Sequence, residues 1–217
     1  MNQHVLTIFL AVALLFSMAV LASHEDGVHV LWNRQGYAPE QPIAFSHRLH
    51  AGELQVDCHY CHSGAEKSRH AGFPAASICM NCHRFVPALL GAIRAEDELA
   101  QAENRPRLPV VSPEIQKIYD ALALDANMQR DLERTREPVR WIKVHSVPDY
   151  VYFDHRPHVN AGVACQRCHG AVETMERVRQ VEDLSMGWCV NCHRRVNEIG
   201  VGGRKVHASV DCVTCHY

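Results

Sequence analysis

The sequence has no excess of positive charge and no cysteine outside five short motifs. Its 22 Lys and Arg residues are offset by 24 Asp and Glu residues, which gives a formal net charge of −2 at pH 7 with neutral histidine. Proteins that bind nucleic acid carry a basic patch or stripe, so this balance argues against nucleic acid as a partner. Because no cysteine is left over, the chemistry of the five motifs accounts for all ten thiols.

Each of the five motifs has the form Cys-x-x-Cys-His, which is the attachment signature of a c-type haem. The spacing has a chemical reason. Two thiols add to the vinyl groups on one edge of a porphyrin, and the next residue turns its imidazole under the iron as the proximal ligand. We therefore expect five haem c groups, held by Cys58, Cys61 and His62, by Cys79, Cys82 and His83, by Cys165, Cys168 and His169, by Cys189, Cys192 and His193, and by Cys212, Cys215 and His216.

Zinc and disulfides are the alternatives for cysteines at this spacing. The gaps between the first and second, third and fourth, and fourth and fifth pairs are 17, 20 and 19 residues, within the range of zinc sites. Zinc fits poorly, because five pairs cannot all be matched into four-cysteine sites and four thiolates leave no reason for a histidine after every pair. Disulfides fit less well still, since Cys-x-x-Cys pairs are typical of redox motifs rather than structural crosslinks.

An internal repeat places a Phe-x-His-x-x-His segment before a cysteine pair in each half of the chain, with its first histidine ten or eleven residues ahead of the pair. A six-coordinate haem needs a second axial ligand, and this length lets the chain loop over the other face of the porphyrin. We expect His47 and His155 to be distal ligands of the haems at Cys58 and Cys165. Residues three apart would struggle to reach one iron together, so we expect His50 and His158 to ligate different haems and to hold two haems close together.

The fifth haem lies outside the repeat, and its distal ligand is less determined. Of the remaining histidines we choose His145, with His207 and His70 in reserve and His29 also available. Methionine can serve as an axial ligand and raises the reduction potential. For Met175 and Met186, however, apolar packing against a haem edge is the better expectation.

The N-terminal region contains an uncharged, mostly apolar run from Val5 to Ala22. As a helix it would measure roughly 27 Å, just enough to cross the hydrocarbon core of a bilayer. Signal peptides have shorter apolar regions preceded by positive charge, and no Lys or Arg precedes this run, although Val20-Leu21-Ala22 could still be a cleavage site. We expect an uncleaved anchor at the cytoplasmic membrane. Cytochrome c maturation takes place outside that membrane, so the haem domain would lie on the periplasmic side.

These features predict four regions. Residues 1–24 would be the transmembrane anchor, 25–87 a first dihaem module, 88–139 a helical insertion without cysteine or histidine, and 140–217 a second dihaem module plus the fifth haem. The expected fold is mostly loops with short α-helices, a multihaem cytochrome c fold organised around five covalently bound haems and preceded by one transmembrane helix. Five haems in 217 residues leave about 43 residues each, so porphyrin faces should form much of the core.

Two helices are expected in the insertion. The first covers Ala88 to Asn104, which is rich in helix formers. The second begins at the Ser112-Pro113 cap and continues to Glu137. Its apolar face should pack on its own domain; it consists of Ile115, Ile118, Tyr119 and Leu122.

The order of these motifs, with WIKVHSVPDYVYFDHRPHV, CQRCHG, MGWCVNCHR and a terminal DCVTCHY, resembles the pentahaem cytochrome c subunit of bacterial alternative complex III. The resemblance covers nearly the whole chain. It implies a non-catalytic electron-transfer subunit that receives electrons from an iron–sulfur subunit. The electrons would leave to a monohaem cytochrome c, a soluble carrier or an oxidase, while an integral membrane subunit of the complex binds quinol.

Other functions remain open at this point. A catalytic multihaem reductase would need a haem with an open face or an altered motif, and all five motifs end in histidine. A stand-alone multihaem quinol dehydrogenase of the small tetrahaem type would carry Cys-x-x-Cys-His-x-Met at its quinol-facing haem, a motif that this sequence lacks. A periplasmic multihaem shuttle is a further alternative.

Overall fold

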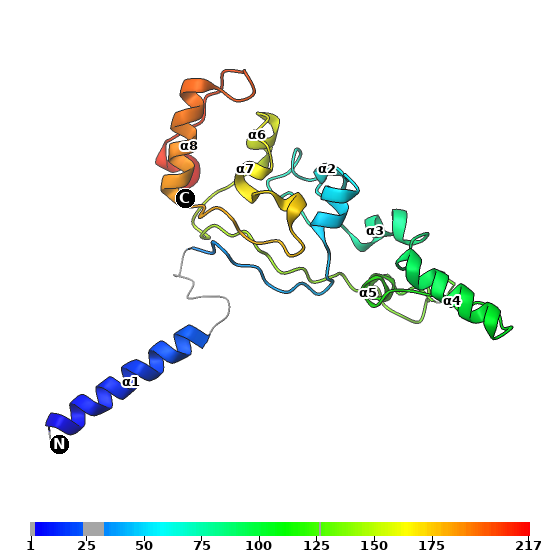
Figure 1. Cartoon of the computed structure of the whole chain (residues 1–217). Coiled ribbons are helices and arrows are strands. Elements are labelled where there is room, and N and C mark those ends of the chain that lie inside the picture. Colours follow the sequence, from blue (N-terminus) through cyan, green and yellow to red (C-terminus); the bar gives the residue numbers. More distant parts are fainter. Residues whose placement is uncertain (1–2, 24–32, 126) are drawn as a thin grey trace.

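The computed structural model describes residues 3–23, 33–125 and 127–217. Within these ranges the chain consists of short helices, turns and loops, with isolated bridges in place of a sheet (Figure 1). The helical segments are α1 (Gln3–Ser23), η1 (Arg48–Glu53, a π-helix), α2 (Cys58–Cys61), α3 (Ala76–His83), α4 (Leu90–Ala102), α5 (Pro113–Ala121), α6 (His155–Asn160), α7 (Gln166–His169), η2 (Val172–Thr174, a 3₁₀-helix), α8 (Met186–Ile199) and α9 (Cys212–Cys215).

The predicted transmembrane anchor over residues 1–24 is wrong. In the part of the chain that the structure describes, no helix is both long and apolar enough to cross a membrane. A span needs about 20 consecutive, predominantly apolar residues. Helix α1 begins with Gln3 and His4, and the hydroxyl groups of Thr7 and Ser17 within it donate to backbone carbonyls.

The predicted localisation included a single N-terminal span of the cytoplasmic membrane, and that span is corrected together with the helix. The periplasmic side was predicted from the place of cytochrome c maturation and not from the helix. Two further expectations cannot be placed, because His29 and the end of the predicted anchor at residue 24 lie outside the described residues.

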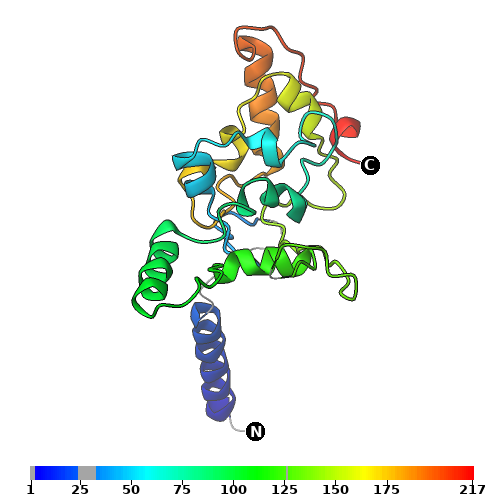
Figure 2. The ribbon, with the colours of Figure 1, turned by 90° about the vertical axis from the view of Figure 1, so that its right-hand side faces the viewer.

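The buried apolar cluster joins the insertion to the second Cys-x-x-Cys-His motif. Ile118 and Tyr119 of α5 pack with Met80 of α3 and with Ile43, and each of these four residues is at most 7% exposed. The Tyr119 hydroxyl donates a hydrogen bond of 2.7 Å to the carbonyl of His83. The apolar face of the second insertion helix therefore packs on its own chain, as predicted. Figure 2 shows α4 and α5 together on one side of the segments that carry the motifs.

Both insertion helices are present, but the second is shorter than predicted. Ser112 caps α5 by accepting a hydrogen bond from the Ile115 amide, as expected, yet the helix ends at Ala121 instead of continuing to Glu137. Ala123 has a φ of 51°, which a helix cannot contain. The Asp125 carboxylate then accepts from the Gln129 amide and stabilises a turn.

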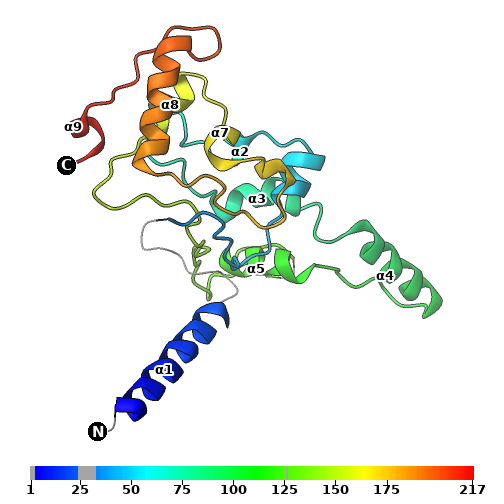
Figure 3. The same ribbon diagram turned by 60° about the vertical axis from the view of Figure 1, so that its left-hand side comes forward.

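The two halves of the chain meet where η1 packs against η2. A Cβ added to Gly52 in η1 would lie 2.3 Å from the Glu173 carbonyl oxygen in η2, so only glycine permits this approach. Helices α2 and α7, which belong to the first and third motifs, lie side by side in Figures 1 and 3.

Candidate haem-binding sites

Each Cys-x-x-Cys-His motif contains a short helical turn. Residues three apart lie on the same face of a helix, so the two thiols of a motif can approach one porphyrin edge together. Asp57 caps α2 by accepting from the His59 amide at 2.7 Å, and Ser185 caps α8 by accepting from the Trp188 amide at 3.1 Å. All ten cysteines are free thiols in the described structure. The local sequence therefore presents paired thiols ready for attachment.

The first histidine of each Phe-x-His-x-x-His segment faces the histidine of the motif that follows it. The rings of His47 and His62 are nearly parallel, with an interplanar angle of 3° and centroids 6.5 Å apart. His155 and His169 repeat this arrangement at 6° and 6.3 Å. These are the partners that the spacing of the repeat predicts for the first and third haems.

The second histidine of each segment faces a different motif. His50 lies opposite His83, with centroids 6.1 Å apart and rings inclined by 61°. His158 lies opposite His193, at 6.0 Å and 34°. Each His-x-x-His pair thus extends from one motif to the next, as expected for a segment shared between two haems.

The spacing of these rings matches two axial ligands on one iron. A metal-bound imidazole nitrogen lies about 2 Å from its metal and the ring centroid about 1 Å farther, so two ligands on opposite faces have centroids about 6 Å apart. All four pairs lie between 6.0 and 6.5 Å among the described residues. No three His, Cys, Asp or Glu side chains in the described ranges form a site for a bare metal ion. Each facing pair therefore suits a flat cofactor with one central metal, which the two imidazoles would bind from opposite faces.

The orientation of most of these rings is fixed by a hydrogen bond on the side away from the partner ring. A carbonyl oxygen only accepts, so each such Nδ1 carries the proton and Nε2 keeps its lone pair for a metal. The Nδ1 to carbonyl pairs are His50–Ser46, His62–Gly72, His83–Val86, His155–Arg69, His158–Asp154 and His193–Ser209, at distances of 2.6 to 3.0 Å.

A phenylalanine positions both histidines of each repeat. The Phe45 ring stacks on His50 with centroids 4.3 Å apart and meets His47 edge-on at 4.9 Å. Phe153 contacts His158 and His155 in the same way, at 4.9 Å each. The repeat in the sequence includes these phenylalanines without indicating their role. Their constant offset from the histidines is the signal that could have indicated it.

Burial favours the neutral form of His47, His158 and His169, and metal ligation requires the neutral form. Burial, followed by the neighbouring imidazoles of His62 and His50, lowers the pKa of His47 to about 4. Burial and then the imidazoles of His145 and His155 lower the pKa of His169 to about 3. Burial also raises the pKa of the Cys168 thiol to about 11.

The fifth motif differs from the other four. The ring neighbour of His216 is Tyr150, with centroids 5.9 Å apart. His145, the ligand predicted for this haem, lies edge-on to His169 at 4.3 Å, which is closer than two ligands of one iron. Its Nε2 is buried and has no hydrogen-bond partner in the described part of the chain. The assignment of His145 to the fifth haem stays a prediction.

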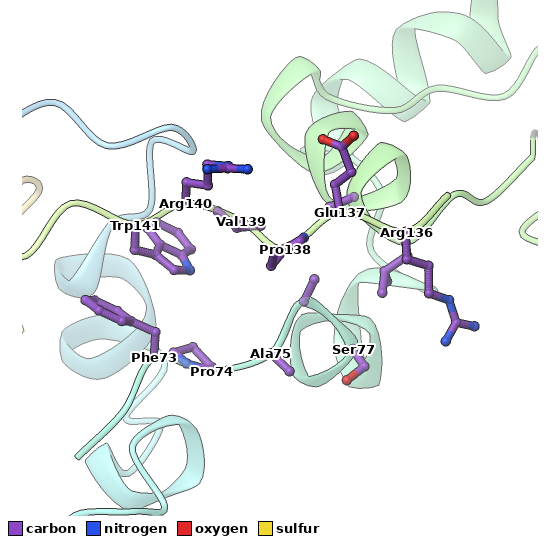
Figure 4. A pocket seen from close by; sticks show the side chains of 13 residues that line it. Phe73, Pro74, Ala75, Ser77, Arg136, Glu137, Pro138, Val139, Arg140 and Trp141 are labelled. Atoms are coloured by element: carbon purple, nitrogen blue, oxygen red, sulfur yellow. The ribbon is translucent and has the colours of Figure 1, made fainter. Parts of the chain in front are cut away.

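A separate cavity of about 540 Å³ lies between the start of α3 and residues 136–141 (Figure 4). The rings of Phe73 and Trp141 in its wall are nearly parallel, with centroids 6.5 Å apart. No cysteine or histidine lines it, so it is distinct from the attachment motifs. The sequence does not reveal this cavity, because its walls come from three separate segments, residues 73–77, 121–122 and 136–141.

Comparison with known proteins identifies the class to which these sites belong. Residues 151–217 match the family described as cytochrome c7 and related cytochrome c. The chain is a multihaem c-type cytochrome. This cytochrome is also 25% identical over 197 residues to the multihaem cytochrome c subunit of menaquinone reductase from Nitratidesulfovibrio vulgaris, covering 82% of its own length and 77% of that protein. Membership of the cytochrome c class implies covalently bound haem c at the motifs.

Proposed function

We propose that this multihaem cytochrome carries five haem c groups and is the electron-transfer subunit of a quinone-linked oxidoreductase complex. The observation that carries the proposal is the set of facing imidazole pairs, because their spacing and available Nε2 atoms suit an iron held between two histidines. The similarity to a subunit of a menaquinone reductase supports the link to quinone chemistry.

In this proposal each haem is attached through both thiols of one motif and is held between two imidazoles. For the first four motifs the distal partners are the ones that face them in the structure. For the fifth we retain His145, whose buried, unpartnered Nε2 in the described structure is available for a metal. The proposed ligand pairs are His62 with His47, His83 with His50, His169 with His155, His193 with His158, and His216 with His145.

Haem c, once bound, supplies one-electron redox chemistry at a potential set by its axial ligands, hydrogen bonding and burial. The chain sets the positions of the imidazole rings that would hold the haems. The hydrogen bonds at Nδ1 hold the rings in position, and the phenylalanine of each repeat fixes two of them relative to each other. Two histidines would hold each iron in this proposal, which would favour electron transfer over substrate binding at iron.

The order of motifs further supports placing the cytochrome in alternative complex III or a close relative of it. We propose that an iron–sulfur subunit exchanges electrons with it, that an integral membrane subunit binds the quinol, and that a monohaem cytochrome c, a soluble carrier or an oxidase lies downstream. Residues 25–87 and 140–217 would form its dihaem modules, with the fifth haem appended to the second and residues 88–139 as an insertion.

Carbon monoxide binding to the reduced protein tests this function against a catalytic one. Bis-histidine iron has no open position, so we expect no carbon monoxide adduct in the Soret spectrum of the wild-type protein. The variant His47→Ala opens one axial position and should bind one equivalent, which provides the positive control. A wild-type adduct at any haem would favour a multihaem reductase instead.

Reduction by a menaquinol analogue tests whether the cytochrome needs partner subunits. Dithionite should reduce the isolated chain fully, whereas the quinol analogue should reduce it only when the other subunits of the complex are present, because they hold the quinol. Rapid reduction of the isolated chain by the quinol analogue would instead indicate a stand-alone quinol dehydrogenase.

A further inference from the structure

The first half of the chain holds the distal histidines of the second half. The carbonyl of Arg69 accepts from both the backbone amide and Nδ1 of His155, at 3.1 and 2.9 Å. The Arg69 guanidinium in turn donates to the carbonyl of Phe153 at 3.0 Å. Because Arg69 follows the first motif closely in sequence, the loop after that motif sets the position of a ligand of the third site.

The second half holds the corresponding segment of the first half in return. The Arg48 amide donates to the Met175 carbonyl at 2.9 Å, and its side chain pairs with Glu176 at 2.5 Å. Gly52 approaches the Glu173 carbonyl so closely that a Cβ would overlap it. The loop after the third motif therefore packs on the segment that carries His47 and His50. The exchange between the halves is reciprocal and involves the first motif of each.

Thiols and imidazoles of the first and third motifs also lie near one another. The Cys165 thiol is near enough to Cys58 to help raise the pKa of the Cys58 thiol, although burial is the larger cause. The imidazoles of His62 and His47 are near enough to His169 to help lower its pKa, although burial is the larger cause. The first and third sites are thus neighbours across the junction between the two halves, where η1 packs against η2.

The second and fourth sites lie outward from this junction. The second site is joined to the first by the hydrogen bond of 2.8 Å from Asn81 to the Tyr60 hydroxyl, and beyond it lies helix α5 with Tyr119. The fourth site is joined to the third through Phe153, whose ring contacts both His155 and His158. The fifth motif adjoins the fourth, since the Ser209 carbonyl before it accepts from His193 Nδ1 (Figure 3 shows α9 beside α8).

We propose that electrons cross between the two halves at the haems of Cys58 and Cys165, the first haem of each half. The order along the relay is then the haem of Cys79, that of Cys58, that of Cys165 and that of Cys189, with the haem of Cys212 beside the fourth. The order therefore differs from the order of the motifs in the sequence. This inference rests on the proposed function, since it presupposes a haem at each motif.

Proton NMR of the fully reduced wild-type protein tests the order directly. Low-spin ferrous haem is diamagnetic, so nuclear Overhauser effects between substituents of two haems report which haems are neighbours. Variants in which one distal histidine is replaced, such as His50→Met and His155→Met, identify each haem by the shifted methyl signal of the new axial ligand. Haem content is measured first, by the pyridine haemochrome, so that a missing haem is recognised separately from a wrong order.

We expect Overhauser effects between the haems of Cys58 and Cys165 and none between the haem of Cys79 and any of the three haems of the second half. Direct contact of the Cys79 haem with the Cys165 or Cys189 haem, in protein with full haem content, would overturn the order while leaving the proposed function intact. Fewer haems than motifs would instead count against the proposed function.

A pair of glycine variants isolates the junction. Gly52→Ala places a methyl group against the Glu173 carbonyl and should weaken or abolish the Overhauser effects between the first and third haems, while those between the first and second remain. Gly91→Ala in α4 is the matched control, because nothing lies within 4 Å of the added Cβ. Unchanged effects between the first and third haems in Gly52→Ala would show that the close approach of Gly52 to Glu173 does not hold these two haems together.

Discussion

At the scale of single residues, each histidine of the paired sites has a partner ring on one side and most have a hydrogen bond on the other. The backbone carbonyls that accept from Nδ1 belong to loops close to the motifs or to the opposite half, so the ligand rings are positioned by backbone atoms that substitution does not remove. Substitution of the histidines themselves is therefore the clearest probe.

The angle between two axial imidazoles governs the electron paramagnetic resonance spectrum of a ferric low-spin haem. Nearly parallel rings, as for His47 with His62, give a rhombic signal, whereas the pair inclined by 61°, His50 with His83, should give a highly anisotropic one. We expect His50→Ala to abolish the anisotropic signal and His47→Ala to remove a rhombic one. If His50→Ala altered only the haem of Cys58, the proposal that His47 and His50 bind two different haems would be wrong.

Tyr119 provides a prediction about stability. Only 3% of Tyr119 is exposed, and its hydroxyl donates to the partly buried carbonyl of His83, so Tyr119→Phe leaves this acceptor without its donor. We expect a loss of about 1 kcal/mol in the free energy of unfolding. Urea titration measures it, with Tyr217→Phe at the exposed C-terminus as control. Equal midpoints for the two variants would show that this hydrogen bond does not stabilise the fold.

At the scale of elements, the segment after α4 is held by Glu96. Its carboxylate pairs with the Arg105 guanidinium at 2.6 Å and accepts from the Leu108 amide at 2.7 Å. The hydrogen bond from Arg105, followed by that from Leu108, lowers the pKa of Glu96 from 4.5 to about 2. A carboxyl group whose pKa is lowered by folding stabilises the fold fully above pH 4.5, and this contribution disappears as the pH falls toward 2.

Hydrogen exchange at the Leu108 amide measures this contribution. Protection, relative to the intrinsic exchange rate at each pH, should fall as the pH is lowered from 4.5 to about 2. In Glu96→Gln protection should already be reduced at neutral pH, and in Glu98→Gln on the same helix it should match the wild type. Constant protection across this pH range would mean that the Glu96 carboxylate does not hold the segment.

Sequence patterns predicted the elements whose determinants are local. The Ser112 cap, the helix of residues 90–102 and the facing of His47 with His62 follow from residues close in sequence. The early end of α5 could not be predicted from the sequence pattern, because a helix of ordinary propensity competes there with the turn that Asp125 stabilises. The prediction of a transmembrane helix was wrong, because no described helix is both long and apolar enough to cross a membrane.

At the scale of the whole molecule, the two halves form a reciprocal pair, each holding the histidine segment of the other. No local pattern could reveal this, because the contacts join Arg69 to His155 and Gly52 to Glu173 across more than 80 residues. The reciprocal packing brings the first motif of each half together and leaves the others outward, which is why the proposed relay does not follow the sequence.

The central claim is that every Cys-x-x-Cys-His motif of this cytochrome carries a covalently attached haem. A pyridine haemochrome assay, on protein whose intact mass is measured in the same preparation, tests it most directly. We expect five haem c groups per polypeptide, one for each pair among the ten cysteines. Fewer than five per chain, in fully matured protein, would contradict it.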